Sequence, residues 1–322
     1  MPVKKVHLLN CLIALFGFFI SLNLLENYTH GDQIVYHIFY EKIAGLSYWD
    51  VGPVAKNVIA SNEPLTWLVL WVGSNMGIQK NVWISLLNVV LMTGLFALLM
   101  RHKAPWYVVL LIFTNFYFLV LITSAERLKI SYIFLTYAFL MGSRKRYLFL
   151  LFAPLAHLQS VIFLAGLVLS ALHEQIRHLI QRFKINKRLF SQSVVLALVA
   201  TPLVFLLKNG IISKLNAYAD AFSFSWFAFA NISLLLLVAT IATTNKLRMV
   251  LALSLMIFAI AVVGGDRVNM VAVTLALGIL MFEQRLRHPL VLLLLLYFSF
   301  KSIPYIKNIY AFGDGFMFMS TQ

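Results

Sequence analysis

Ser124-Ala125-Glu126-Arg127 is a short charged stretch that stands between two long apolar runs, 105–123 and 128–141. A second acid–arginine step, Asp266-Arg267, likewise lies between two apolar runs. Charged residues beside membrane-length apolar segments are costly to bury and usually serve a function. The two steps therefore indicate functional positions in a chain made of apolar helices.

The composition is that of a membrane protein. Of 322 residues, 61% are hydrophobic and only 11% are charged, which is too little charge for an ordinary soluble surface. Many apolar runs approach the roughly 20 residues that a helix needs to cross a bilayer. We predict an all-α, polytopic integral membrane protein of one domain, 1–322, with about 9–11 transmembrane helices.

The net charge of +15 reports topology rather than a nucleic-acid partner. Most of the basic residues gather in short segments between apolar runs, where acidic residues are few. Such enrichment is typical of cytoplasmic loops. We therefore expect a cytoplasmic N-terminus and a basic cytoplasmic loop at 171–190. The basic segments lie at 4–5, 101–103, 144–146, 177–188, 246–248 and 285–287.

The segment 26–63 carries mainly acidic charges and many aromatic residues, and we expect it on the extracytoplasmic side, as we do the loop 208–224. Asp32, Tyr36 and Tyr40 are spaced four residues apart, so on a helix they share one face. That face is either the solvated side of an amphipathic helix with interfacial tyrosines or one wall of a sugar-binding cavity.

Two apolar segments do not fit a simple alternation of crossings. The run that begins at Glu63-Pro64 is better explained as a helix in the interface, or one that dips and returns, because Trp67 and Trp71 suit the interface. Residues 147–170 have basic clusters at both ends, and Pro154 interrupts them. A re-entrant or broken helix pair satisfies both observations, although a single span remains an alternative.

Both arginines open short helices whose N-termini are expected to face outward. A run of about 15 residues rises only about 22 Å, against a hydrocarbon core of about 30 Å, so Arg127 and Arg267 should lie in a cavity below the outer surface. Helix N-termini favour anions, and guanidinium matches phosphate oxygens. We expect both arginines to hold one pyrophosphate. Alternatively, each pairs with its neighbouring acid or lies among lipid headgroups, and Asp266 serves as an N-cap.

Three residues could act as acids or bases. His157 could be a base, a hydrogen-bond donor to a substrate or a satisfied core histidine, and Asp32 and Glu63 are possible bases for a sugar hydroxyl. The sequence has no HExxH, CxxC, GxSxG or phosphate-loop signature. We therefore expect no metal site and no cofactor.

Five features follow one another between residues 26 and 170. They are a Gly–Asp step with spaced tyrosines, a Glu–Pro helix start, an arginine that opens a helix, a basic turn, and a histidine with a nearby serine. They lie at Gly31-Asp32 with Tyr36 and Tyr40, Glu63-Pro64, Arg127, Arg144-Lys145-Arg146, and His157 with Ser160. This order resembles the EpsG-like, Wzy-type polysaccharide polymerases of bacterial inner membranes. The chain differs in carrying Glu26 where the family often has an arginine, and Gln159 where it usually has a serine.

The resemblance implies a glycosyltransferase that joins undecaprenyl-pyrophosphate-linked oligosaccharides at the periplasmic face, with a flippase and a chain-length regulator as partners. It leaves O-antigen, capsule and exopolysaccharide open as the product. The expected roles divide the candidate residues into three groups: Arg127 and Arg267 on the pyrophosphate; His157, Asp32 or Glu63 on the acceptor hydroxyl; and Tyr36, Tyr40, Glu126 and Asp266 on the glycan. The alternatives are a flippase or transporter of the same lipid and a membrane acyltransferase.

Overall fold

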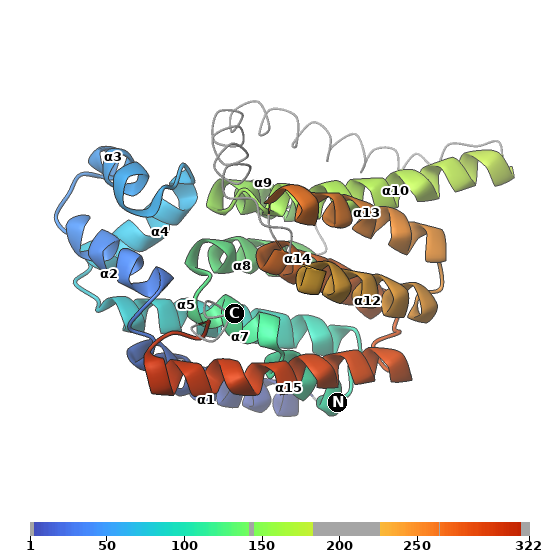
Figure 1. Ribbon diagram of the computed structural model, residues 1–322, viewed down its shortest axis with the longest axis horizontal. Coiled ribbons are helices and arrows are strands. Elements are labelled where there is room, and N and C mark those ends of the chain that lie inside the picture. Colours follow the sequence, from blue (N-terminus) through green and yellow to red (C-terminus); the bar gives the residue numbers. More distant parts are fainter. Residues whose placement is uncertain (1–2, 142–144, 183–225, 264, 317–322) are drawn as a thin grey trace. The chain divides into compact units, whose positions relative to one another are not determined.

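The computed structural model describes residues 3–141, 145–182, 226–263 and 265–316, and the regular elements in these ranges are all α-helices (Figure 1). The all-α fold class is therefore confirmed. The chain divides into two compact units, and the single transmembrane domain expected over 1–322 stays a prediction. Unit 1 comprises Met1–Arg101, Val109–His157 and Leu295–Gln322, and unit 2 comprises His102–Val108 and Leu158–Leu294.

Unit 1 holds most of the candidate residues. Its helices are α1 (Val3–Asn27), α2 (Asp32–Lys42), α3 (Tyr48–Ile59), α4 (Pro64–Asn75), α5 (Lys80–Arg101), α7 (Phe116–Thr123), α8 (Glu126–Leu140) and α9 (Arg146–Ala156). Unit 2 holds α10 (Ser160–Arg182), α12 (Trp226–Ala242), α13 (Lys246–Val263) and α14 (Gly265–Phe282). The helices α6 (Trp106–Phe113) and α15 (Pro289–Phe312) contribute residues to both units.

Three helices of the described ranges are long and apolar enough to cross a membrane: Leu8–Asn27 within α1, α5 and α15. The bent pair α6 and α7 would make a fourth span. The protein is thus a membrane protein by the length and composition of its helices. Four shorter apolar stretches of 10–17 residues lie in the described part of the chain, at Arg146–Ala156, Ser160–His173, Trp226–Ala242 and Val268–Phe282. The larger number expected from the sequence counted such shorter runs as crossings.

The run 105–123, expected to be one helix, is broken. Helix α6 ends at Phe113 and α7 begins at Phe116, with a bend of 53° between them. Asn115 causes the break locally, because its side-chain oxygen accepts a hydrogen bond from Tyr117 N at 2.8 Å and so caps α7. The hydropathy pattern did not predict this break, because a single asparagine hardly changes the mean hydropathy of an apolar run.

The break expected between residues 147 and 170 is present, but Pro154 does not make it. Pro154 lies inside α9, and the chain leaves the helix at His157, whose φ of −157° and ψ of 127° are extended. The next helix, α10, continues to Arg182, so residues 171–182 of the expected basic cytoplasmic loop are helical, and their sidedness stays a prediction. The extracytoplasmic loop expected at 208–224 lies outside the described residues.

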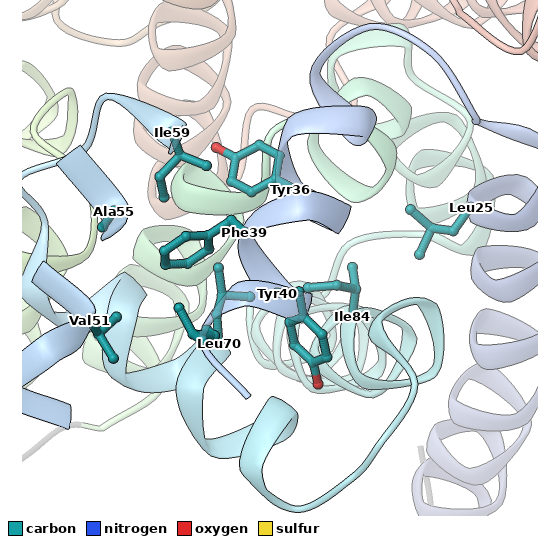
Figure 2. Close-up of a cluster of buried hydrophobic side chains, with 10 residues drawn as sticks. Leu25, Tyr36, Phe39, Tyr40, Val51, Ala55, Ile59, Leu70 and Ile84 are labelled. Atoms are coloured by element: carbon teal, nitrogen blue, oxygen red, sulfur yellow. The ribbon is translucent and has the colours of Figure 1, made fainter. Parts of the chain in front are cut away.

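The segment 26–63, expected as an extracytoplasmic loop or interfacial helices, contains the packed helices α2 and α3. Side chains from α1 to α5 form one apolar cluster (Figure 2), in which Phe39, Ile43 and Val51 are fully buried. Trp67 and Trp71 are partly buried against this cluster, and the interfacial position expected for them stays a prediction. At 12 residues, α4 rises only about 18 Å, too little to cross a core of about 30 Å. The packing of α2 and α4 in this cluster positions Tyr36 and Glu63.

Candidate functional site

Glu63 stands between a cation and a histidine in unit 1. Its Oε2 accepts a hydrogen bond from Arg127 Nη1 at 3.0 Å, and its Oε1 lies 3.0 Å from His157 Nδ1. The carboxylate is only 2% exposed. Arg127 and His157, which lie 64 and 94 positions from Glu63 in the sequence, thus meet at its buried carboxylate. All three residues were predicted from the sequence. We refer to Glu63, Arg127, His157, Tyr36 and Ser61 as the Glu63 cluster.

The start of α4 presents the Glu63 carboxylate to this cluster. Glu63 is the N-cap residue in extended conformation, and Pro64 at the first helical position suits a helix start. The Glu63 side chain does not cap its own helix. Ser61 Oγ instead hydrogen-bonds Glu63 Oε2, accepts from Glu63 N at 3.2 Å, and accepts from Trp67 Nε1 at 3.3 Å. These bonds hold the carboxylate toward Arg127 and His157.

His157 is held at the end of α9. The hydroxyl of Thr66, in the first turn of α4, donates to Ala156 O at 2.6 Å, and His157 N donates to Ala153 O at 2.9 Å. The imidazole is buried, with Nδ1 on the Glu63 carboxylate. A carboxylate at Nδ1 fixes the orientation of the imidazole ring.

Arg127 is the most open member of the cluster. It is the second residue of α8, and its side chain is 14% exposed. It also hydrogen-bonds the hydroxyl of Tyr36, whose ring extends from α2 beside Phe39 and Ile59 (Figure 2). Burial raises the pKa of Tyr36 to about 12, a rise that Arg127 opposes. The phenol therefore stays protonated at neutral pH, accepting from Arg127 and keeping its own proton to donate.

Glu126, expected on the glycan, is instead sealed inside unit 1. Its side chain and that of Lys129 are 0% exposed and form an ion pair of 2.9 Å, one helical turn apart. Gln33 Nε2 donates to the other carboxylate oxygen at 2.9 Å, and Lys80 Nζ donates to Gln33 Oε1. Lys129 Nζ also reaches Ile122 O at 3.0 Å. This Glu126 network (Gln33, Lys80, Glu126, Lys129) has no face for a glycan.

The other predicted residues have separate environments. Tyr40 is buried and its hydroxyl donates to Ile78 O at 2.9 Å, so it ties α2 to the turn after α4. Asp32 is exposed at the first residue of α2. The expected common face therefore joins two buried tyrosines to an exposed acid. Asp266 and Arg267 begin α14, but their side chains lie outside what the structure describes, so a chamber shared by both arginines stays a prediction.

The sequence reasoning missed Ser61, Gln33, Lys80 and Lys129. The Glu126–Lys129 pair had a readable signal, because side chains three residues apart on a helix are neighbours. Ser61 and Gln33 had none, since their partners depend on the tertiary fold. Within the described ranges, no three His, Cys, Asp or Glu side chains are grouped as metal ligands.

Comparisons with other proteins add no relative to this geometry. No protein-family model, no curated protein and no solved structure matches the chain. The function must therefore be argued from the cluster itself and from the resemblance in the order of motifs.

Proposed function

We propose that this protein is a Wzy-type polysaccharide polymerase of the bacterial inner membrane. It would transfer a glycan from its undecaprenyl pyrophosphate to the terminal sugar of another lipid-linked unit at the periplasmic face. The observation that carries the proposal is one buried carboxylate, Glu63, that joins a potential base, His157, to a cation, Arg127. The motif order of residues 26–170 supplies the substrate class.

In the proposed reaction, His157 accepts a proton at Nε2 from the acceptor hydroxyl. The hydroxyl oxygen bonds to the anomeric carbon of the donor, and the bond from that carbon to the pyrophosphate oxygen breaks. The lipid pyrophosphate leaves with the electron pair. Glu63, at 3.0 Å from His157 Nδ1, stabilises the imidazolium that forms.

Arg127 would bind the departing pyrophosphate. Guanidinium has five N–H donors in a planar fork, and only some of them engage Glu63 and Tyr36. The first turn of α8 adds the positive end of a helix, which favours an anion at this position. A preorganised cation that meets developing negative charge lowers the barrier of such a transfer. Arg267 remains the proposed second contact with the pyrophosphate.

The test replaces arginine by lysine at two positions, in a strain that lacks the gene. Arg127→Lys keeps the charge but loses the fork, so we expect long-chain polymer to disappear and single-unit product to remain on gels of surface glycan. Arg101→Lys is the matched control, because Arg101 is exposed, lies outside the Glu63 cluster and donates to Leu140 O of α8 at 2.6 Å. Full-length polymer in the Arg127→Lys strain would discard the pyrophosphate assignment.

A membrane acyltransferase is the second candidate, favoured by one observation. Such enzymes use a histidine with a charged partner, and Glu63 provides an acid beside His157 that is not evident in the sequence. The same deletion strain separates the two functions. Normal chain length with loss of acyl substituents would identify an acyltransferase, whereas total loss of surface glycan would favour the flippase.

A further inference from the structure

Unit 2 contains a pocket of about 190 Å³ between two basic turns that are far apart in the sequence. The turn before α6 supplies His102, Lys103 and Ala104, and the turn between α14 and α15 supplies Gln284, Leu286 and Arg287. Arg287 Nη2 donates to Lys103 O at 3.0 Å and so joins the turns. The pocket is independent of the Glu63 cluster and of the function proposed for it.

The backbone of both turns is held in an uncommon conformation. Lys103 and Gln284 each have a φ of 57°, in the left-handed region that residues other than glycine rarely adopt. Such conformations persist only where the surrounding structure imposes them, and they are enriched at ligand-binding positions. Here they turn the chain so that Lys103 and Arg287 line the same hollow.

The charge in the pocket is positive, and the nearest acid of the second turn is directed elsewhere. Glu283 accepts hydrogen bonds from Thr243 Oγ1 at 2.8 Å and Thr244 N at 2.9 Å. It also faces Arg248 at 3.9 Å. Because Glu283 is committed to the turn between α12 and α13, it leaves the positive charges of Lys103 and Arg287 for an external anion. Arg287 spends one N–H group on Lys103 O and has others that suit phosphate oxygens.

Exposed aromatic rings beside the pocket indicate where the anion comes from. Trp106, the first residue of α6, is 75% exposed, and Phe282, the last residue of α14, is 43% exposed. The His102 ring stands edge-on to Phe282 at 4.7 Å. Tryptophan and basic residues together are typical of the level of lipid headgroups, and basic pockets there bind anionic lipids. Inorganic phosphate has no apolar part that could contact the exposed rings, whereas a phospholipid has acyl chains.

We propose that this pocket binds the phosphate of an anionic phospholipid headgroup, with Lys103 and Arg287 on the phosphate and Trp106 beside the acyl chains. Both turns belong to basic segments that the sequence assigns to the cytoplasmic side. The ligand is therefore a lipid of the inner leaflet, where a resident lipid fixes the two turns together.

The experiment measures lipid binding to the purified full chain in detergent by native mass spectrometry. The probes are phosphatidylglycerol, phosphatidylcholine and inorganic phosphate. We expect phosphatidylglycerol to bind and Lys103→Gln/Arg287→Gln to weaken that binding about 10-fold, as for the loss of charge-assisted hydrogen bonds. The control, Lys246→Gln/Arg285→Gln, removes the same two residue types from exposed positions outside the pocket lining and should bind within about 2-fold of the parent protein.

Two further variants protect the test against misfolding and identify the source of phosphate. Lys103→Arg/Arg287→Lys keeps both charges and should retain binding, while Trp106→Ala should weaken the lipid but not inorganic phosphate. Equal loss in the pocket and control variants would overturn the proposal. So would phosphatidylcholine binding as tightly as phosphatidylglycerol, or inorganic phosphate binding as tightly as the lipid.

Discussion

Glu126 and Arg127 are consecutive residues, yet their side chains enter two clusters of opposite character. Glu126 pairs with Lys129 one turn away, and both side chains are fully buried. Arg127 pairs with Glu63, 64 residues away, and keeps 14% of its side chain exposed. Because consecutive helical residues point about 100° apart, the start of α8 serves both clusters.

The difference separates a structural use of charge from a functional one. In the Glu126 network each carboxylate oxygen has a partner, so a ligand could only disrupt it. In the Glu63 cluster both carboxylate oxygens also have partners, but the guanidinium of Arg127 is partly exposed and has N–H groups beyond the one that Glu63 accepts. The sealed network fixes the helix start, and the more open cluster offers charge to a ligand.

The largest effect should come from breaking the sealed network. Lys129→Met leaves Glu126 buried without its ion-pair partner, which should lower the free energy of unfolding by about 3–5 kcal/mol. Denaturation in mixed micelles measures this. The double variant Glu126→Gln/Lys129→Met removes both charges and should recover most of the loss. A single variant as stable as the parent protein would show that the network is not structural.

Breaking the Glu63 cluster should cost activity more than stability. His157→Gln removes the proposed base, so the rate of polymer formation in isolated membranes should fall about 100-fold. The control His173→Gln makes the same substitution in α10, outside the cluster, and should leave the rate unchanged. Equal rates in the two variants would end the assignment of His157 as a base.

A smaller effect is expected from Ser61→Ala, which removes the hydroxyl that orients Glu63. Loss of this buried hydrogen-bonding group should cost about 1 kcal/mol of stability and reduce turnover without abolishing it. Ser302→Ala is the matched control, because the buried Ser302 hydroxyl bonds only to its own helix, at Ser299 O. If both variants keep full turnover, Ser61 does not position the carboxylate.

The smallest effect concerns Tyr36 and pH. Its pKa is raised from 10.0 to about 12, chiefly by burial, so the folded protein holds this proton more tightly than the unfolded chain. The stability that this contributes is complete below pH 10 and is lost as pH rises toward 12. Tyr36→Phe should make that alkaline decline shallower and leave the pH–activity profile below pH 10 unaltered. A shifted profile there would mean that Tyr36 titrates during turnover.

The sequence identified four members of the Glu63 cluster, but it identified neither Ser61 nor the pairing of Glu63 with Arg127 and His157. Glu63 precedes a proline that starts a helix, Arg127 opens a helix, and His157 follows an interrupted apolar run. Each position has a local signal. Which acid holds Arg127 depends on how α2, α4, α8 and α9 pack, and adjacency in the chain pointed to the wrong one. Only the Glu126–Lys129 pair was set by local geometry.

Some helix boundaries could be predicted from the sequence, and others depend on side-chain contacts. The hydropathy pattern located α8 closely, because the apolar run 128–141 follows the charged step Glu126-Arg127. It did not show that α6 and α7 are separate, since Asn115 breaks the run through one side-chain hydrogen bond. Nor did it show that α9 continues past Pro154, because the end of that helix depends on contacts with α4.

The short helix α4 grips the end of α9 at two neighbouring points. Glu63 holds the His157 ring, and one turn along, Thr66 holds the Ala156 carbonyl. These two attachments join α4 to the end of α9 in the sequence of contacts Thr66–Ala156 and Glu63–His157. A substitution that displaces the first turn of α4 would therefore move the His157 imidazole together with the Glu63 carboxylate.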